Sequence, residues 1–381
     1  MRRRVVASGN VSDISCLLSE HRYEIVRQIH EGGMGIVYEA RQLGSRGFVK
    51  RVAIKVVRDR YAQNAEFIEN FVGEAKLVAD LIHTNIVQTY HLGDSKGSYF
   101  IAMELIRGVN LEQFLHQLVA QQQSLPQELA VFIVSRVVRG LAYAHAKTDP
   151  EGKPLGIVHR DVNPKNIMIA LEGDVKLTEF GVAQARGFLT DKEGEEVAGK
   201  PEYMSPEQAD FQITDKRSDI FSVGVVLLQL LAGQNIFKGA TAEESRNRVL
   251  ACQIPDLAVV CPGLPVELQG IIRRTLQRDP AARYQSADDF LYELEYFIYH
   301  KGYGPTNETL GKFIRELFKA EIAARKAARP NRSGETMKLA GATTSRAPQG
   351  ETKAGRSGGT RVTPKRTAKP GLFEQLKAKL K

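Results

Sequence analysis

The sequence predicts an α+β protein with two lobes, of which the first is small and rich in β-strands and the second is mostly helical. Residues 23–57 alternate apolar and polar side chains around a glycine cluster, and apolar residues recur at helical spacing from Pro126 to about residue 300. The composition, with 43% hydrophobic and 25% charged residues, is that of a globular chain. It excludes a collagen-like fibre, a membrane bundle and wholesale disorder.

The first lobe is predicted to be a small sheet with one helix. The alternation in residues 23–57 predicts a hairpin that continues into a third strand at 51–57. Residues 66–81 have the apolar spacing of a helix, and residues 98–105 have the pattern of a further strand, which Arg107 and Gly108 end.

The second lobe is predicted to consist mainly of helices. Pro126 is expected in the first turn of a helix whose apolar face carries Leu129, Ile133, Val137 and Leu141. The apolar stretch 223–232 has about half of the roughly 20 residues that a membrane span needs, so it predicts a buried helix. Asn307 is expected to cap a later amphipathic helix that docks on the body. Its apolar stripe is Leu310, Phe313, Ile314, Leu317, Phe318 and Ile322.

These patterns divide the chain into four parts. Residues 1–20 are an N-terminal extension, and residues 21–300 are the two-lobed body, with the first lobe at 21–105 and the second at 106–300. Residues 301–329 contain the docking helix. Residues 330–381 are rich in Gly, Ser, Thr, Pro, Lys and Arg, and this composition predicts a disordered basic C-terminal tail.

All of the net charge of +9 lies in the tail. Residues 1–329 contain 41 basic and 41 acidic residues, whereas residues 330–381 contain 12 and 3. Such a tail attracts polyanions, and its end can form an amphipathic helix on a partner. The expected partner is therefore an acidic protein or an anionic membrane surface, and a solvated linker is the alternative. Specific nucleic-acid binding is not expected, because Phe373 is the only aromatic residue among the basic ones.

The cysteines and the N-terminus predict a cytoplasmic protein. Cys16, Cys252 and Cys261 are odd in number and lack the spacing of a zinc site or a disulfide framework. The chain starts with basic residues but lacks the apolar run of about 7–15 residues that completes a signal peptide. We therefore expect no export.

Four motifs follow one another along the body. The first is a glycine-rich turn between two predicted strands, where backbone N–H groups can approach phosphate oxygens. The motifs are His30-Glu31-Gly32-Gly33-Met34-Gly35, Val52-Ala53-Ile54-Lys55, His159-Arg160-Asp161 with Asn166, and Glu179-Phe180-Gly181. A glycine-rich hairpin without a ligand is the alternative for the first motif alone. The order and spacing of all four argue against a chance occurrence of each motif.

With these motifs the sequence resembles the bacterial eukaryotic-like (Hanks-type) serine/threonine protein kinase family, over residues 21 to about 300. The resemblance implies a two-lobed protein kinase fold that binds ATP and Mg²⁺ or Mn²⁺ and acts on protein substrates. It implies transfer of the ATP γ-phosphoryl group to serine or threonine hydroxyls. Such transfer depends mostly on positioning and charge neutralisation, which these residue types can provide.

The resemblance also assigns roles to single residues. Lys55 corresponds to the lysine that holds the α- and β-phosphates, and Glu74 corresponds to its ion-pair partner. Asp161 corresponds to the catalytic base and Asn166 to a metal ligand. The residues implied to bind the nucleotide are Gly32, Gly33, Gly35, Val37, Ala53, Lys55, Met103, Glu104 and Ile106.

Three further residues correspond to structural positions of the family. Asp219 corresponds to the residue that braces the catalytic loop, and we expect it to open the apolar helix at 219–232. Arg283 is expected to be the buried partner of Glu207, which ends the activation segment.

Glu179 stands where the family has the aspartate that binds magnesium. Magnesium requires octahedral geometry with oxygens at about 2.0–2.1 Å, so a different rotamer or a water must absorb the extra methylene. The charge is kept while the geometry changes, which predicts a slower kinase that favours manganese. The alternative is a catalytically weak or inactive pseudokinase that acts as a scaffold.

The other departures concern the glycine-rich loop and the charge at the γ-phosphate. His30 occupies the first glycine position of the loop and is expected to reduce its flexibility. Asn163 replaces the lysine that serine/threonine kinases place two residues after the catalytic aspartate, and Lys200 replaces a threonine before Ser205-Pro206-Glu207. Lys165 or Lys200 is expected to supply the missing charge, and Lys165 is counted among the catalytic residues.

Overall fold

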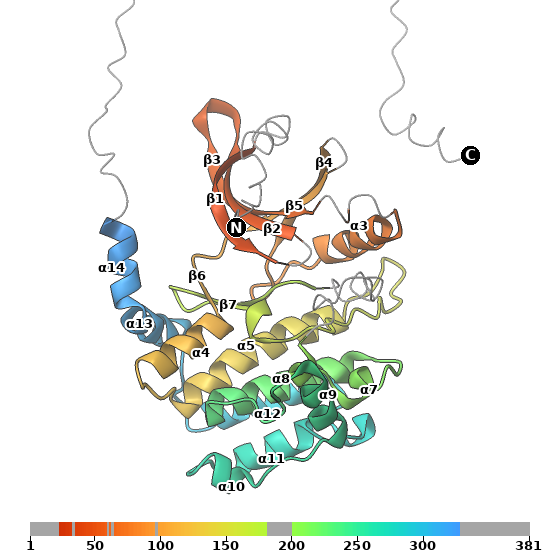
Figure 1. Cartoon of the computed structure of the whole chain (residues 1–381), viewed down its shortest axis with the longest axis vertical. Helices are drawn as coiled ribbons and strands as arrows, with labels where there is room; N and C mark the ends of the chain where they lie inside the picture. Colours follow the sequence, from red (N-terminus) through yellow and green to blue (C-terminus); the bar gives the residue numbers. More distant parts are fainter. Residues whose placement is uncertain are drawn as a thin grey trace, which may run out of the picture. The chain divides into compact units, whose positions relative to one another are not determined.

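The structure is a computed structural model that describes residues 23–32, 35–58, 61, 65–95, 98–180 and 200–327, all within one compact unit. These residues form a β-rich N-lobe, drawn in red and orange, and a helical C-lobe, drawn from yellow to blue (Figure 1). The predicted two-lobed α+β fold is confirmed. The predicted N-terminal extension and the predicted basic tail lie outside the described residues.

A five-stranded antiparallel sheet with the order β1-β2-β3-β5-β4 forms the N-lobe (Figure 1). Its strands are β1 (Tyr23–Glu31), β2 (Gly35–Leu43), β3 (Val49–Val57), β4 (Thr89–Ser95) and β5 (Ser98–Glu104), with the short turn η1 (Ser45–Gly47) between β2 and β3. The predicted helix is α3 (Ala65–Ala79), which packs through Phe67 and Phe71 against Val57. Sequence alternation therefore identified the sheet, with the third strand starting at Val49 rather than at residue 51.

The alternation of side chains gives the N-lobe sheet a core face and a cleft face. Val52 and Ile54 are fully buried and pack with Tyr23 and Phe100 on the core face. Lys55 lies opposite Val37 in the β2–β3 pairing, so its side chain belongs to the other face. The strand pattern thus presents Lys55 toward the C-lobe.

The C-lobe begins with a three-stranded sheet and with the helix α4 (Leu111–Ala120), which directly follows the first strand of this sheet. The strands are β6 (Gly108–Asn110), β7 (Ile167–Ala170) and β8 (Val175–Leu177), in the order β6-β7-β8. Asn110 caps α4, because its side chain accepts a hydrogen bond from Gln113 N while the Gln113 side chain accepts one from Asn110 N. α4 therefore starts beside the connection between the lobes.

Two long helices, α5 (Gln127–His145) and α8 (Lys216–Ala232), run through the centre of the C-lobe core. The predicted buried helix at 223–232 is confirmed as part of α8. The expectation that Asp219 opens this helix is wrong, because the helix starts at Lys216 and Asp215 caps it through Arg217 N. The remaining helical elements are η2 (Pro164–Asn166), η3 (Pro201–Tyr203), α7 (Pro206–Ala209), α9 (Ala242–Ala251), α10 (Leu257–Val260), α11 (Val266–Thr275), η4 (Pro280–Ala282) and α12 (Ala287–Tyr299).

Two helices, α13 (Asn307–Leu317) and α14 (Lys319–Ala327), stand where the sequence predicted one. The predicted cap at Asn307 is also wrong. Thr306 is the N-cap, because its hydroxyl accepts a hydrogen bond from Thr309 N, and the Asn307 amide donates to Asp174 Oδ1 at 2.7 Å. α13 ends where the carbonyl of Leu317 accepts hydrogen bonds from the side chains of Gln117 in α4 and of Gln121, the residue that caps the C-terminal end of α4.

α13 packs on the C-lobe, as its apolar stripe suggests. Leu310, Ile314 and Leu317 are buried in the C-lobe core. Gly173 has φ +95°, and a Cβ there would lie 1.8 Å from the carbonyl oxygen of Asn307. The β7–β8 turn can therefore approach α13 only because residue 173 is glycine.

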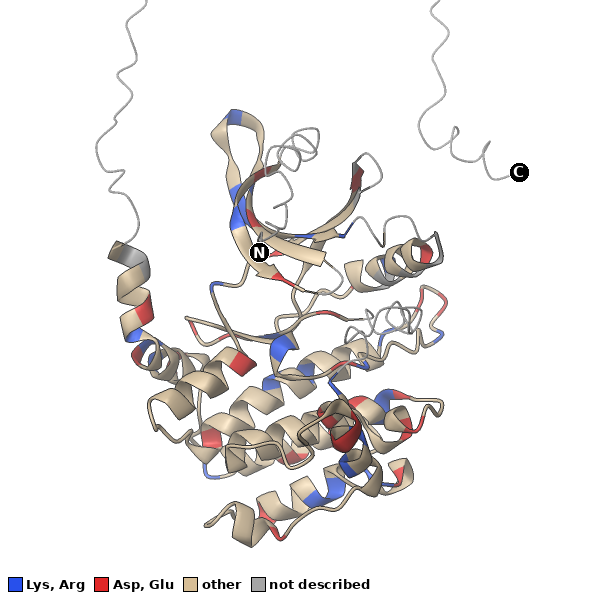
Figure 2. Cartoon of the chain, in the orientation of Figure 1, with Lys and Arg blue, Asp and Glu red and all other residues tan. Residues whose placement is uncertain are grey.

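Both basic and acidic residues are scattered over the two lobes, in keeping with the equal counts in residues 1–329 (Figure 2). Among the described residues, no helix combines the length and the apolar character that crossing a membrane requires.

Candidate functional site

A pocket of about 60 Å³ lies between the N-lobe sheet, α3 and the segment that follows β8. Its apolar lining includes Phe71 and Phe180. Three of the residues expected at the site, Lys55, Met103 and Glu179, also line it. Strands of one lobe and a loop of the other thus bring together residues that are far apart in the sequence.

Lys55 and Glu179 form an ion pair inside this pocket. The side chains are only 12% and 19% exposed, so solvent screens the pair less than a surface pair. Glu179 has φ +64°, which is uncommon for a residue with a Cβ and is typical of functional loops. The backbone is thus held in a conformation that directs the Glu179 carboxylate to the lysine.

The expected pair between Lys55 and Glu74 remains a prediction. Glu74 lies in α3, but its side chain lies outside the described part of the structure.

The loop 159–166, which the resemblance assigns as the catalytic loop, holds the Asp161 carboxylate between two amides. Asn163 Nδ2 donates to Asp161 Oδ1 at 3.0 Å, and Asn166 Nδ2 donates to Asp161 Oδ2 at 2.9 Å. Asn163 Oδ1 in turn accepts a hydrogen bond from Lys165 N at 2.9 Å. Both asparagines are buried, and Asp161 is 9% exposed. The Asn163 side chain thus fixes both the Asp161 carboxylate and the turn that carries Lys165 and Asn166.

The sequence identified Asn163 only as a missing lysine and did not predict its bond to Asp161. The sequence did contain a signal for part of this arrangement, since Asn163 stands directly before Pro164. An asparagine side chain in such a turn often accepts a hydrogen bond from the backbone N–H two residues later, which here is that of Lys165.

Asp219 braces the catalytic loop from α8, as the sequence predicted. Its carboxylate accepts the backbone N–H groups of His159 and Arg160, each at 2.8 Å, and contacts His145 Nε2 at 2.8 Å. Burial acts to raise the pKa of Asp219, but the hydrogen bonds and charges of the two histidines hold it below its ordinary value. The fully buried carboxylate therefore remains ionised and fixes a loop in which Arg160 has φ +64°.

The catalytic loop is joined to the segment that carries Glu179. Thr178 N donates to Asn166 O at 2.9 Å, and Thr178 O lies 2.9 Å from His159 Nε2. The ring of Phe180 packs on the His159 ring, with 4.6 Å between centroids. These contacts couple the position of Glu179 to that of Asn166.

The glycine-rich turn is described at Gly32 and Gly35, whereas Gly33 lies outside the described residues. Gly32 N donates to Gly35 O at 2.9 Å and closes the turn. A Cβ on Gly35 would lie 2.5 Å from Val56 O, so only glycine fits there. His30 belongs to β1, is paired with Val37 and is exposed.

The residues expected to bind adenine lie along β3, β5 and the connection to the C-lobe. Ala53 is paired with Met103, and both belong to the cleft face with Lys55. Glu104 N donates to Gln88 O at 2.8 Å, and the Glu104 side chain accepts a hydrogen bond from Lys176 at 3.0 Å. Ile106 follows in the connection. Glu104 thus ties the two lobes together.

The two lysines that were expected to supply charge at the phosphate have different surroundings. Lys200 forms an ion pair with Glu112 of α4. Lys165 is the one exposed residue of the segment Asp161–Asn166. The sequence did not predict the pair between Lys200 and Glu112, because it joins positions 88 residues apart and neither belongs to a motif.

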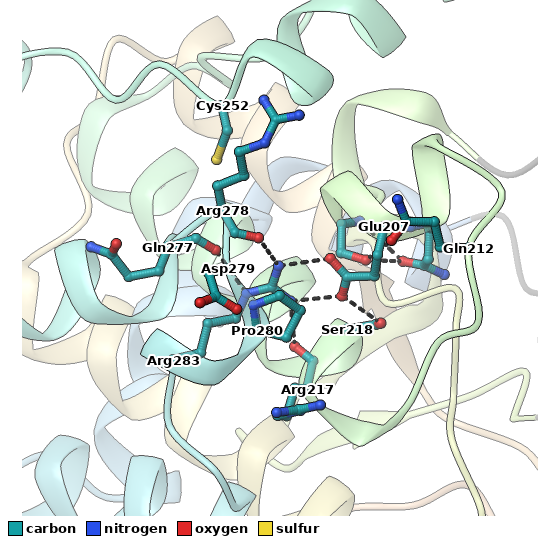
Figure 3. Close-up of polar contacts among 12 residues, drawn as sticks. Glu207, Gln212, Arg217, Ser218, Cys252, Gln277, Arg278, Asp279, Pro280 and Arg283 are labelled. Atoms are coloured by element: carbon teal, nitrogen blue, oxygen red, sulfur yellow. Dashed lines mark hydrogen bonds and ion pairs between the residues drawn. The ribbon is translucent and has the colours of Figure 1, made fainter.

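Glu207 and Arg283 form a buried bidentate pair, as predicted (Figure 3). Arg283 Nη1 and Nη2 each donate to a different Glu207 oxygen at 2.7 Å, and Ser218 Oγ donates to Glu207 Oε1 at 2.8 Å. Three backbone carbonyls accept the other hydrogen bonds of Arg283, namely those of Gln277, Arg217 and Arg278 (Figure 3). The pair connects α7 to the loop after α11.

The chemistry of the donor set is compatible with a hard divalent cation. Asn166 directs its amide nitrogen to Asp161, which leaves its Oδ1 as a possible ligand oxygen. Glu179 provides a carboxylate, and it follows Thr178, whose backbone N–H donates to the Asn166 carbonyl. Carboxylate and amide oxygens are the ligands that Mg²⁺ and Mn²⁺ prefer. Among the described residues, no group of three or more His, Cys, Asp or Glu side chains is arranged so that it could hold a metal ion by itself.

Comparison with known proteins identifies relatives of this fold and site. Residues 23–297 match the protein kinase domain family. The solved kinase domain of PknI from Mycobacterium tuberculosis covers 72% of this chain with a TM-score of 0.54 and 27% identity, over 95% of its own length.

Curated relatives include kinases from three bacteria. The tyrosine-protein kinase MasK of Myxococcus xanthus is 34% identical over 78% of this chain and 46% of its own length. The serine/threonine-protein kinase PrkC of Bacillus subtilis is 36% identical over 70% of this chain and 39% of its length. PknL of Mycobacterium tuberculosis, a serine/threonine-protein kinase, is 34% identical over 74% of this chain and 67% of its length.

The chain spans less than half the length of MasK and PrkC. The match nevertheless covers both lobes and every motif of the cleft. The chain therefore belongs to the protein kinase family, in the bacterial Hanks-type group that includes PrkC and PknL.

Proposed function

We propose that the protein transfers the γ-phosphoryl group of ATP to serine or threonine hydroxyls of protein substrates. The observation that carries this proposal is the Asp161 carboxylate, fixed between the amides of Asn163 and Asn166 beside a cleft that contains Lys55 and Glu179. A carboxylate held in this way can accept the proton of an incoming hydroxyl. Serine and threonine acceptors are supported by the similarity to the serine/threonine-protein kinases PrkC and PknL, whereas the relative MasK is a tyrosine-protein kinase.

Each residue of the cleft has a part in this proposal. Lys55 neutralises phosphate charge, and the glycine-rich turn that Gly32 and Gly35 close binds the phosphates. Met103, Glu104 and Ile106 border the adenine, with Val37 and Ala53 on the sheet above it. Asp219 holds the catalytic loop so that Asp161 keeps its position.

Asn166 and Glu179 would hold the divalent metal. When bound, Mg²⁺ or Mn²⁺ supplies charge neutralisation to the phosphates. Glu179 is longer than the family's aspartate by one methylene, and it contacts Lys55. Since Mn²⁺ tolerates a wider range of ligand geometry than Mg²⁺, we propose that Mn²⁺ supports the faster reaction.

Glu179→Asp should raise the Mg²⁺-supported kcat by about tenfold, because the shorter side chain suits octahedral coordination. The ratio of Mn²⁺-supported to Mg²⁺-supported kcat should fall accordingly. Steady-state transfer from labelled ATP to a protein acceptor measures both values, and phosphoamino-acid analysis identifies the acceptor hydroxyl. Lys55→Ala is the control and should abolish transfer. Activity that persists in Lys55→Ala would come from another enzyme, and absence of transfer in the native chain would favour the scaffold alternative.

Asn163→Ala should lower kcat by up to about 100-fold and leave the KM for ATP unchanged, because it releases Asp161 and the turn that carries Lys165. Asn163→Lys, which restores the family's residue, should recover most of the rate. Asn85→Ala is a matched control, since it removes another buried amide, one that donates to Val175 O. An Asn163→Ala enzyme with native kcat would show that the amide does not position the base.

The expectations for the tail and for location rest on the sequence alone. We propose that residues 330–381 bind an acidic partner or an anionic membrane surface, and that the protein acts in the cytoplasm.

A further inference from the structure

Three basic side chains surround Glu112 at the start of α4, beside the catalytic loop. Lys200 is bonded to Glu112, and both side chains are about one quarter exposed, at 26% and 29%. Lys165 lies in η2, which packs against α4. His116 follows Glu112 by one helical turn and is exposed.

The basic side chains favour the ionised form of Glu112. Burial acts to raise the pKa of Glu112, but the hydrogen bond and charge of Lys200, with the charges of Lys165 and His116, hold it below its ordinary value. With Glu112 ionised, Lys165 and Lys200 together carry one more charge than this carboxylate at neutral pH. The group therefore has the capacity to bind a further anion.

The two lysines come from the two segments that border the position of the acceptor hydroxyl. Lys165, four positions after Asp161, is the exposed residue of the segment 161–166. Lys200 begins the segment 200–209, which returns to the catalytic loop where Gln208 Nε2 donates to Arg160 O at 2.9 Å. A peptide bound for phosphorylation therefore lies against both segments.

We propose that Lys165 and Lys200 select protein substrates that carry Asp or Glu next to the phosphorylated serine or threonine. This inference rests on the proposed kinase activity and names the substrate class of the same site. Glu112 neutralises Lys200 when no substrate is bound, and a substrate carboxylate takes its place. The exposed position of Lys165 suits contact with a protein substrate better than contact with a phosphate inside the cleft.

A set of peptides with a central serine and with acidic, neutral or basic neighbours tests this selection in the full-length protein. The acidic peptide should have a kcat/KM about tenfold above that of the neutral peptide, as two partly exposed charge pairs provide. This preference should shrink at about 1 M salt, where the Debye length is about 3 Å. Glu112→Gln should increase the preference, because it frees Lys200.

Lys165→Glu should reverse the order, so that the basic peptide becomes the better substrate. Lys301→Glu is the matched control, because it makes the same change of charge at an exposed residue after α12, and it should keep the native order. Equal kcat/KM values for the three peptides, or the same order in Lys165→Glu as in Lys301→Glu, would overturn the inference. Lys55-dependent transfer to a general protein acceptor separates this failure from failure of the kinase activity itself.

Discussion

Asp161→Asn should lower kcat by about 10²- to 10⁴-fold, because the amide cannot accept the proton of the acceptor hydroxyl. The substitution keeps the size of the side chain, and Asn163 and Asn166 remain beside it. Binding of ATP should change little, since the nucleotide contacts assigned to Lys55 and the glycine-rich turn are not altered. The variant thus separates proton acceptance from nucleotide binding.

Single-turnover phosphoryl transfer and equilibrium binding of a fluorescent ATP analogue measure these two effects. Asp149→Asn is the matched control, because it makes the same chemical change in a surface loop, where Asp149 accepts two backbone N–H groups. It should leave kcat and the Kd for nucleotide at their native values. If Asp161→Asn transferred phosphate at the native rate, Asp161 could not be the base.

Local patterns were sufficient to predict the fold. The alternation in residues 23–57 identified three strands of the N-lobe, because one face of the sheet must be apolar to pack on a core. Helix ends were less predictable. Asp219 and Asn307 are both good caps by residue type, but Asp215 and Thr306 satisfy the first N–H groups of the two helices instead. Residue type alone does not show which of two neighbouring residues caps a helix. The side chain of Asn307, for example, donates a hydrogen bond to Asp174 and does not cap α13.

The candidate site was predictable where it depends on motifs. Lys55, Met103 and Glu179 line one pocket, and Glu207 pairs with Arg283. The ion pair of Lys55 with Glu179 was not predicted, because the sequence gives the spacing of motifs but not the direction of side chains. The bond from Asn163 to Asp161 and the pair of Lys200 with Glu112 were missed for a related reason. Asn163 and Lys200 depart from the family, so the resemblance did not say which residue either side chain contacts.

Arg283→Ala should destabilise the C-lobe by about 3–5 kcal/mol, which is the largest loss of stability that we expect from a single substitution. Arg283 is 1% exposed and makes two hydrogen bonds to Glu207 and three to backbone carbonyls (Figure 3). Its removal leaves the Glu207 carboxylate and these carbonyls buried without their main donor. Arg283→Lys should recover only part of the loss, because an ammonium cannot donate in the bidentate geometry.

The ion pair of Glu207 with Arg283 should also make the free energy of unfolding depend on pH. Burial acts to raise the pKa of Glu207, but the hydrogen bonds and charge of Arg283 hold it below its ordinary value. A carboxyl group with a lowered pKa in the folded state stabilises fully above its unfolded pKa of about 4.3, and this contribution disappears as the pH falls through the folded value. Acid should therefore destabilise the native chain more than the Arg283→Ala variant. The difference between their free energies of unfolding should become smaller below about pH 4.

Denaturant unfolding at pH 7 and at about pH 3 measures both effects. Arg273→Ala is the control, because Arg273 is 49% exposed and lies 3.8 Å from its partner Asp256. It should change stability by no more than about 0.5 kcal/mol at either pH. A loss in Arg283→Ala no larger than in Arg273→Ala would mean that the buried pair does not hold α7 to the loop after α11. Since α7 follows the segment that begins at Lys200, a real loss should also lower phosphoryl transfer by loosening that segment beside Asp161.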